Sequence, residues 1–395
     1  MINRTLEPIL RDLASQYPVV TLTGPRQSGK TTLCRKVFPD AAYANLESPD
    51  VREYALSDPR GFLSAYPSVV IIDEIQRVPL LVSYIQGIVD EDKTPGRFIL
   101  TGSQQFEVMN TINQSLAGRT ALLKLLPFSI SEIRKTTLPA SLDMMMLKGF
   151  YPRIHDQGLN PTQALGDYYE TYIERDLRQL MSIRDLSLFQ KFVRLCAGRI
   201  GQILNTQSLA NDTGVSHTTI HAWLSLLEAS YIIFLLKPWY QNVSRRLIKS
   251  PKLYFYDVGL AAYLLGMESE THVSRDPLRG NLFENLVLME AIKHRLNKGG
   301  KNAVTFYRDS RGNEVDIILE GGREVFPLEV KAGATIAEDF FKGLKHFTRV
   351  AGEPPHGGGL IYGGKEIQQR GYFRIYPVTA MAEMFETLNA DGFFY

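Results

Sequence analysis

The chain has 395 residues, 44% of them hydrophobic and 22% charged, which is the ordinary composition of a folded protein with two or three domains. Its net charge of +2 excludes a global basic field for nucleic acid, so any such contact must come from local clusters. The two cysteines, Cys34 and Cys196, suit a reducing compartment. The sequence shows neither a signal-peptide core nor an apolar run long enough for a bilayer, so we expect a soluble, cytoplasmic protein without a membrane partner.

Residues 1–136 alternate short apolar runs with helical stretches, the pattern of a parallel α/β sheet. Combined with the phosphate-binding loop that follows its first strand, this pattern predicts a P-loop NTPase domain. The expected strands are Val19–Thr23, Ala42–Leu46, Val69–Ile72, Phe98–Leu100 and Ala121–Leu126.

The first expected strand runs directly into "GPRQSGKTT", which has the spacing G-x-x-x-x-G-K-[ST] of a phosphate-binding loop. The glycines let the backbone curl so that its N–H groups face the phosphates, and Lys30 would reach the β- and γ-phosphates. The Thr31 hydroxyl would bind Mg²⁺, so ATP and Mg²⁺ are the expected cofactors. The predicted binding residues are Gly24, Pro25, Arg26, Gln27, Ser28, Gly29, Lys30, Thr31 and Thr32.

The apolar run "VVIIDEI" ends in two acids at the carboxyl end of an expected strand, where open α/β sheets bind ligands. Asp73 would hold Mg²⁺ through water, and Glu74 would polarise the attacking water. A metal-holding acid beside a base-like neighbour favours hydrolysis over mere nucleotide storage.

Two further polar residues fit the same site, each with a structural alternative. Ser103 follows a strand in "LTGS", where a hydroxyl could sense the γ-phosphate, although a strand-end turn explains it equally well. Arg119 in "LAGR" could stabilise transition-state charge in cis or from a neighbouring subunit of a homo-oligomer. A surface ion pair is the alternative for Arg119.

Together, "GPRQSGKTT", "IIDEIQ", "LTGS" and "LAGR" resemble a widespread prokaryotic family of AAA-type ATPases. The segments "YPRI" (Tyr151–Ile154) and "YIERDL" (Tyr172–Leu177) extend the resemblance into the C-terminal half, which in that family is a domain of unknown function. The resemblance implies ATP binding and hydrolysis and names no substrate.

Residues 160–270 are mainly helical and contain a helix-turn-helix pattern. A turn at Gly214 and an N-cap at Ser216 precede a helix with a polar face of His217, Thr218, His221 and Ser225. A basic cluster resembling a wing follows, comprising Arg245, Arg246, Lys249 and Lys252. This winged-helix domain could contact DNA backbone phosphates, or it could serve only as a packing module, because the expected recognition helix lacks Arg and Lys.

In residues 275–395, an expected helix, Leu282–Leu296, leads into two strands in "NEVDIILEGGREVFPLEVKAG". If the turn spans Gly321–Glu324, Glu320 pairs with Val325 and Asp316 lies opposite Glu329, on the same sheet face as Lys331. Two like charges at that separation destabilise a sheet, and a divalent cation between them would remove the repulsion. The alternative is a solvated face with an exposed Glu314–Lys331 pair.

The order Glu284, Asp316, Glu329, Lys331 resembles the PD-(D/E)XK nuclease fold, although Val315 stands where that motif has proline. We therefore predict a candidate metal site at these four residues in an α/β restriction-endonuclease-like domain. Our leading hypothesis couples nucleotide state to action on DNA or RNA. The alternatives are a regulatory ATP switch that binds a protein partner, and a nucleic-acid-binding ATPase without cleavage.

Overall fold

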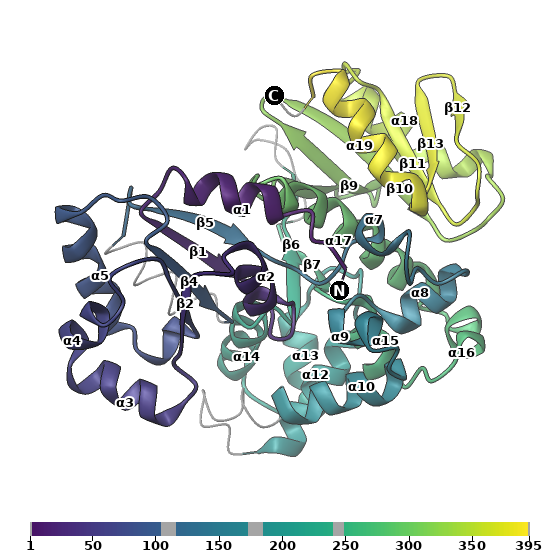
Figure 1. Cartoon of the computed structure of the whole chain (residues 1–395). Coiled ribbons are helices and arrows are strands. Elements are labelled where there is room, and N and C mark those ends of the chain that lie inside the picture. Colours follow the sequence, from purple (N-terminus) through teal and green to yellow (C-terminus); the bar gives the residue numbers. More distant parts are fainter. Residues whose placement is uncertain (1, 104–115, 173–184, 240–248, 394–395) are drawn as a thin grey trace. The chain divides into compact units, whose positions relative to one another are not determined.

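The computed structural model describes residues 2–103, 116–172, 185–239 and 249–393 and forms two compact units (Figure 1). The first unit comprises residues 1–128, 229–231 and 295–301, and the second comprises the remainder. Each unit is described separately below.

The first unit is built on a five-stranded, all-parallel sheet with the strand order β2-β3-β4-β1-β5. Its elements are α1 (Glu7–Ala14), β1 (Val19–Thr23), α2 (Lys30–Val37), β2 (Ala42–Asn45), α3 (Pro49–Ser57), α4 (Pro59–Ser64), β3 (Val70–Asp73), a 3₁₀ turn η1 (Ile75–Arg77), α5 (Leu80–Glu91), β4 (Phe98–Gly102) and β5 (Thr120–Lys124). The predicted parallel α/β domain is confirmed, and each predicted strand is present within one or two residues at either end.

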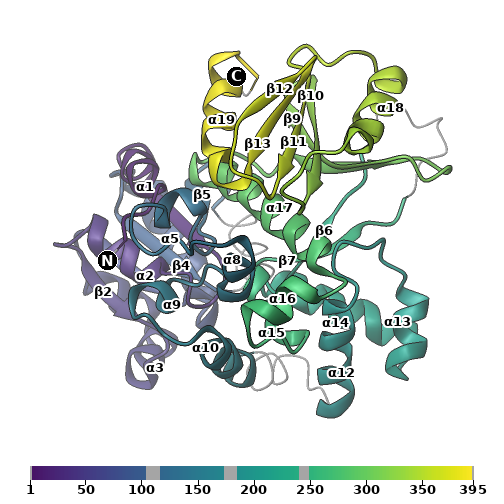
Figure 2. The same ribbon diagram turned by 90° about the vertical axis from the view of Figure 1, so that its right-hand side faces the viewer.

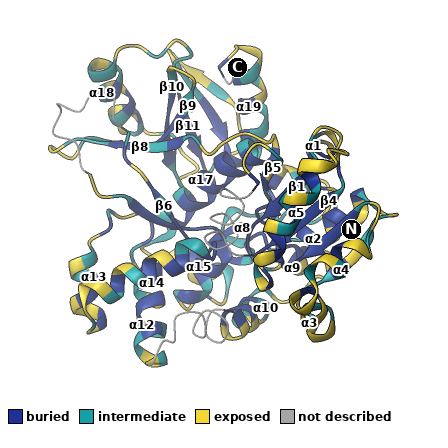
Figure 3. Ribbon diagram, turned by 90° about the vertical axis from the view of Figure 1, so that its left-hand side faces the viewer, coloured by how far each residue is buried: buried dark blue, intermediate teal, exposed yellow. Residues whose placement is uncertain are grey.

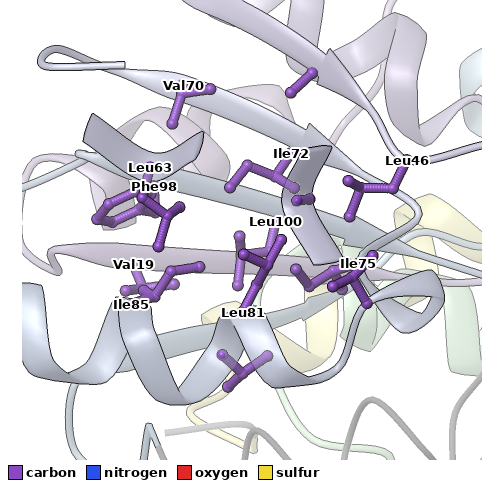
Figure 4. Packing of buried hydrophobic residues seen from close by; sticks show 14 of the residues in the cluster. Val19, Leu46, Leu63, Val70, Ile72, Ile75, Leu81, Ile85, Phe98 and Leu100 are labelled. Atoms are coloured by element: carbon purple, nitrogen blue, oxygen red, sulfur yellow. The ribbon is translucent and has the colours of Figure 1, made fainter. Parts of the chain in front are cut away.

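Alternation along the strands sends neighbouring side chains into two separate cores. On one face, Val19, Ile72 and Leu100 pack against Leu81 and Ile85 of α5 (Figure 4). A second cluster combines other residues of the same strands with α1 and α2; it includes Val20, Leu22, Ile71, Ile99, Leu10, Leu33 and Val37. Helices therefore cover both faces, and the polar loops at the strand ends carry the site.

The second unit begins with a helical part. Its elements are α7 (Ile130–Ile133), α8 (Leu142–Lys148), α9 (Pro152–Asp156), α10 (Pro161–Tyr168), α12 (Leu186–Ala197), α13 (Thr206–Thr213), α14 (His217–Ala229), β6 (Ile233–Leu236), β7 (Lys252–Phe255), α15 (Val258–Leu264), α16 (Glu270–Arg275) and α17 (Arg279–Asn297). Between α13 and α14, Gly214 has a φ of 87°, and the Ser216 hydroxyl caps α14 through the Thr219 N–H at 3.1 Å. The helix-turn-helix is therefore present, and β6 and β7 follow it as an antiparallel pair.

A six-stranded mixed sheet with the order β12-β13-β11-β10-β9-β8 forms the C-terminal part of this unit. Its elements are β8 (Val304–Arg308), β9 (Glu314–Gly321), β10 (Glu324–Lys331), a 3₁₀ turn η3 (Glu338–Phe341), α18 (Lys342–Ala351), β11 (Gly358–Tyr362), β12 (Gln368–Arg370), β13 (Phe373–Pro377), a 3₁₀ turn η4 (Val378–Ala380) and α19 (Met381–Ala390). Figure 2 shows α18 and α19 on the two sides of this sheet. The inner strands are buried (Figure 3).

The β9–β10 hairpin has the predicted register. Glu320 pairs with Val325 and Gly321 with Glu324, so the alternative two-residue turn at Gly321 and Gly322 is wrong. The recorded pairs end at Ile317 and Leu328, and Asp316 and Glu329 are the next residues on the two strands.

Candidate functional site

The loop between β1 and α2 has the backbone conformation that its glycines predict. Gly24 and Gly29 have φ values of 148° and 90°, and a Cβ on Gly24 would collide with the carbonyl oxygen of Leu125. Gln27 also has a positive φ, 61°, which is uncommon for a residue with a side chain. The loop is thus curled tightly at the N-terminus of α2, which is a favourable place for an anion.

Lys30 begins α2 and turns its ammonium back over this loop. Nζ donates hydrogen bonds to the carbonyl oxygens of Gly24 at 3.0 Å and Pro25 at 2.8 Å. Burial lowers the pKa of Lys30, and the charges of Glu74 and Asp73 act in the opposite direction. The ammonium is therefore held by the carbonyl oxygens of the loop itself.

Asp73, at the end of β3, is where side chains from three other elements converge. Its Oδ2 accepts hydrogen bonds from the Thr31 hydroxyl at 2.7 Å and the Tyr43 hydroxyl at 2.8 Å, and its Oδ1 accepts one from Thr101. The sequence predicted Thr31 beside Asp73. Thr101 ends the strand that we expected to bring a hydroxyl to the γ-phosphate, and here its hydroxyl contacts Asp73 instead. The sequence did not reveal Tyr43, which lies in β2, the neighbouring parallel strand.

Glu74 follows Asp73 in a left-handed conformation, with φ 57° and ψ 47°. Its Oε2 accepts hydrogen bonds from the Ser103 hydroxyl at 3.0 Å and from the Gln76 amide. The Gln76 amide also lies 3.1 Å from the Ser103 Oγ. Ser103 therefore contacts the predicted base, and Gln76 is a further residue of the site that sequence reasoning missed.

Two predicted arginines are engaged in ion pairs. Arg26 contacts Glu47, which also lies 3.7 Å from Arg77. Arg119 contacts Asp90 through two nitrogen atoms, one of them at 3.0 Å, and both side chains are largely exposed. This is the surface ion pair that the structural alternative describes.

Arg4 supports the phosphate loop through hydrogen bonds, and no motif in the sequence points to this role. Its guanidinium donates to the carbonyl oxygens of Ser28 at 2.8 Å and Leu126 at 2.6 Å, and it lies over the Phe128 ring at 4.9 Å. Because Arg4 is 9% exposed, these charge-assisted bonds lie away from water and tie the loop to the segment after β5.

The second predicted site lies in the C-terminal sheet, and its residues do converge. Lys331 Nζ is 2.6 Å from Glu329 Oε1 and 3.5 Å from Asp316 Oδ2, and the Val330 N–H donates to Asp316 at 2.8 Å. Asp316 and Glu329 are both buried, so the solvated-face alternative is wrong. The expected Glu314–Lys331 pair is not recorded, because Glu314 contacts Arg308 at 2.7 Å and Lys252.

Lys252 corrects one expectation of the sequence. We placed it in the basic wing, but it is 2% exposed and lies in β7, with its ammonium 2.8 Å from Glu284 Oε1 and in contact with Glu314. Tyr254, two residues along the same strand face, donates to Glu284. Lys252 therefore cannot contact DNA phosphates from the surface.

Burial shifts the acids of this cluster strongly. It raises the pKa of Glu284 to about 7 against the opposing effect of Lys252, and it raises the pKa of Glu329 to about 8 together with the charge of Asp316. The carboxylates of Lys252's neighbours outweigh the effect of burial and keep the pKa of this lysine well above its ordinary value. The cluster thus combines protonatable acids with a permanently charged lysine.

Both sites contain the donor types that their predicted ions require. Thr31 and Asp73 offer adjacent oxygens next to a loop curled for phosphates, which suits Mg²⁺ and a nucleotide. Carboxylate oxygens of Glu284, Glu314 and Asp316 lie within 4.8 Å of one another, so a cation could bridge them. Glu314 was not in the predicted set.

The polar face of α14 is exposed at His217, Thr218, His221 and Ser225, as predicted. His217 is already engaged, since its Nε2 lies 2.7 Å from the Thr206 hydroxyl and its ring contacts His221. Of the predicted wing, Arg245 and Arg246 lie outside the described residues, as does most of "YIERDL", while Lys249 is exposed. In the part of the chain that the structure describes, no helix has the length and hydropathy to cross a bilayer.

Three sequence families match successive parts of the chain. Residues 16–134 match an AAA domain, residues 139–271 a domain of unknown function (DUF8612), and residues 279–381 a further domain of unknown function (DUF4143). The N-terminal domain is therefore an AAA-type P-loop ATPase domain, as the motifs predicted.

Two curated mycobacterial proteins are similar over most of their length. They are the uncharacterized protein Rv2008c of Mycobacterium tuberculosis and the uncharacterized protein Mb2031c of Mycobacterium bovis, each 31% identical over 329 residues. Each alignment covers 82% of this chain and 73% of the relative.

Solved structures of three ATPases or DNA-processing proteins are distantly similar. The Walker-type ATPase PABY2304 of Pyrococcus abyssi is 16% identical, with a TM-score of 0.41, over 66% of this chain and 94% of its own. The RuvB Holliday junction branch migration motor of Thermotoga maritima is 19% identical, with a TM-score of 0.32, over 60% and 90%. AMPPCP-bound DnaA of Aquifex aeolicus is 14% identical, with a TM-score of 0.31, over 56% and 85%.

Proposed function

This chain belongs to the same family as the mycobacterial proteins Rv2008c and Mb2031c. From its AAA domain and its phosphate-binding loop we propose that it binds and hydrolyses ATP with Mg²⁺. The observation that supports this best is the 2.7 Å hydrogen bond between Thr31 and Asp73 beside the curled loop that carries Lys30. This bond joins the hydroxyl and the acid that would hold Mg²⁺.

In this proposal backbone N–H groups of residues 26–32 bind the phosphates, and Lys30 exchanges its bonds to Gly24 and Pro25 for phosphate oxygens. Thr31 and Asp73 would hold Mg²⁺, which would supply positive charge to offset that of the phosphates. Tyr43 and Thr101 keep the Asp73 carboxylate in position.

Glu74 is the residue that orients water and accepts its proton. Ser103 and Gln76 hold its carboxylate from one side, so one of its oxygens is fixed while the other stays available for the water. The ion pair with Asp90 supports a structural role for Arg119. Its alternative is stabilisation of transition-state charge, in cis or from a neighbouring subunit of a homo-oligomer.

The experiment is phosphate release by the purified chain and by Lys30→Ala and Glu74→Gln. Both variants should lose turnover, but Glu74→Gln should still bind ATP in calorimetry because its phosphate-binding loop is intact. Turnover that persists in both variants contradicts the assignment of the site.

We further propose that the chain has the domains predicted above, an ATPase domain (1–136), a winged-helix domain (160–270) and a PD-(D/E)XK-like domain (275–395), and that nucleotide state controls the last domain on DNA or RNA. The convergence of Glu284, Asp316, Glu329 and Lys331 supports a metal-dependent site there. Incubation with plasmid or single-stranded DNA and Mg²⁺ or Mn²⁺ tests cleavage. Cleavage that survives in Asp316→Ala comes from a contaminant.

A regulatory ATP switch that binds a protein partner is the second candidate. Two observations favour it: lysines already neutralise the C-terminal acids, and the exposed face of α14 has no Arg or Lys. A gel shift across a salt series separates the two, because binding through phosphates must weaken as salt rises. Absence of any shift at low salt favours the protein-binding switch.

A further inference from the structure

Lys252 is a buried lysine whose charge the proposed ATPase chemistry does not use. It is 2% exposed, although lysine is among the residues least often buried. Its ammonium lies 2.8 Å from Glu284 Oε1 of α17, contacts Glu314 of β9 and lies 5.5 Å from the centre of the Phe306 ring. Such burial is tolerated only because the acids compensate the cost of desolvation.

The acids around Lys252 are arranged as the ligands of a cation would be. One oxygen from each of Glu284, Glu314 and Asp316 lies within 4.8 Å of the others. Glu329, on the neighbouring strand, is 8% exposed, and its Oε2 has no recorded hydrogen bond, while its Oε1 binds Lys331. Four acids therefore lie close to the cations Lys252, Lys331 and Arg308.

We propose that Lys252 is a built-in cation that competes with a divalent metal ion for the cluster of Glu284, Glu314 and Asp316. This inference rests on the proposed metal-dependent role of the C-terminal domain and specifies which group of the chain opposes the metal. The cluster holds either the Lys252 ammonium or a metal ion, so the metal binds only when the lysine side chain leaves the cluster.

The Lys252 ammonium and a metal ion exclude each other for two reasons. Both are positively charged, and both need the lone pairs of the same carboxylate oxygens. A divalent ion beside a buried ammonium would meet strong repulsion, because a protein interior screens charges far less than water does. The ammonium also donates hydrogen bonds to carboxylate oxygens that a metal would use as ligands. Removing Lys252 should therefore expose ready-made oxygen ligands for Mg²⁺ or Mn²⁺.

The test uses the full chain without nucleotide and measures Mn²⁺ binding by electron paramagnetic resonance and by the shift in melting temperature. Lys252→Met should bind Mn²⁺ at least about tenfold more tightly than the wild type, and Mn²⁺ should raise its melting temperature. Adding Asp316→Asn to Lys252→Met should abolish both effects.

Lys293→Met is the matched control. Lys293 is also a buried lysine of the second unit, 1% exposed and 3.0 Å from Glu290, and it lies over the Phe150 ring at 4.1 Å. Its removal should lower stability in the same way, but Mn²⁺ should not restore it, because Glu290 is outside the three-carboxylate cluster. If Mn²⁺ restored the stability of both Lys252→Met and Lys293→Met, its effect would be general and the proposal would be overturned.

Two further results would overturn it. The first is Mn²⁺ binding by the wild type that equals Lys252→Met and disappears in Asp316→Asn, because Lys252 then excludes nothing. The second is a folded Lys252→Met that binds no Mn²⁺ at the cluster. If Lys252→Met does not fold, Lys252→Gln replaces it, and failure of both variants to fold even with Mn²⁺ counts against the proposal, since the metal then cannot replace the lysine.

These outcomes remain separate from those of the proposed function. A Lys252→Met variant that binds Mn²⁺ but neither binds nor cleaves nucleic acid supports the competition and contradicts the nucleic-acid role. Equal Mn²⁺ binding by wild type and variant, together with metal-dependent cleavage, does the reverse.

Discussion

The hydroxyl of Thr31 donates a 2.7 Å hydrogen bond to Oδ2 of Asp73, joining the start of α2 to the end of β3. The two residues are 42 positions apart in sequence, and strand β4 separates β1 from β3 in the sheet. The parallel arrangement nevertheless brings both to one edge, where a nucleotide-bound Mg²⁺ would need them.

Thr31→Val keeps the shape of the side chain and removes this hydroxyl. We expect Mg²⁺-dependent ATP turnover to need roughly 10- to 100-fold more Mg²⁺, the usual effect of losing an interaction of a metal site. Phosphate release measured across a Mg²⁺ titration checks this. Thr32→Val is the control, because only the backbone N–H of Thr32 is proposed to bind phosphate and its side chain is exposed at the next position of the same helix. Equal loss in both variants would point to helix damage instead.

Ser103→Ala and Gln76→Ala each remove one donor to Glu74. We expect kcat to fall roughly tenfold in each, part of the ~100-fold or more that a positioned base contributes, while KM for ATP stays nearly constant. Steady-state kinetics separate the two constants. A rise in KM with unchanged kcat would mean that these side chains bind nucleotide rather than position Glu74.

Arg4→Met removes the hydrogen bonds that tie the phosphate loop to the segment after β5. Loss of the charge-assisted bonds to Ser28 and Leu126 should cost about 1.5–3 kcal/mol of unfolding free energy, and ATP affinity should fall with it. Urea denaturation and calorimetry measure the two effects. Arg11→Met is the matched control, since Arg11 is exposed and its pair with Glu7 is worth little; similar losses in both variants would argue against a special role for Arg4.

Stability should depend on pH through Glu329. Burial and Asp316 raise its pKa to about 8 in the folded chain, above the ordinary 4.5 of the unfolded chain, so between these values the folded state binds more protons. The stabilisation that results from this proton binding is fully present below the pKa that Glu329 has in the unfolded chain. It is lost as the pH rises through the pKa that Glu329 has in the folded chain. Glu284, with a pKa raised to about 7, acts in the same direction.

In metal-free buffer, Glu329→Gln should therefore flatten the fall in melting temperature between about pH 5 and pH 8.5. Thermal melts of wild type and variant over this range provide the measurement. A wild-type slope that the substitution leaves unchanged would mean that Glu329 does not titrate there.

Local patterns predicted the fold of the ATPase domain well. A strand of five buried residues such as Val19–Thr23 is visible as an apolar run, and the loop after it has its own spacing signature. The hairpin register also followed from the sequence, because alternation and a short turn leave few other pairings. These features depend on neighbours in sequence.

Contacts between distant segments were not predictable in the same way. Arg4, Tyr43 and Gln76 each look like an ordinary surface residue until the sheet brings a partner to them. Lys252 was assigned to a basic wing because three other cations precede it closely in sequence, but its acids come from later segments. A single sequence gives no signal for such pairs.

The position of Lys252 also bears on inheritance. The lysine falls in the segment matched by one domain family, 139–271, while Glu284 and Glu314 fall in the next, 279–381. Recombination at the border between those segments would produce one chain in which the Lys252 ammonium lacks its acids and another in which Glu284 and Glu314 lack the lysine. Exchange of either module alone would therefore leave buried charges unpaired and lower the stability of the chain.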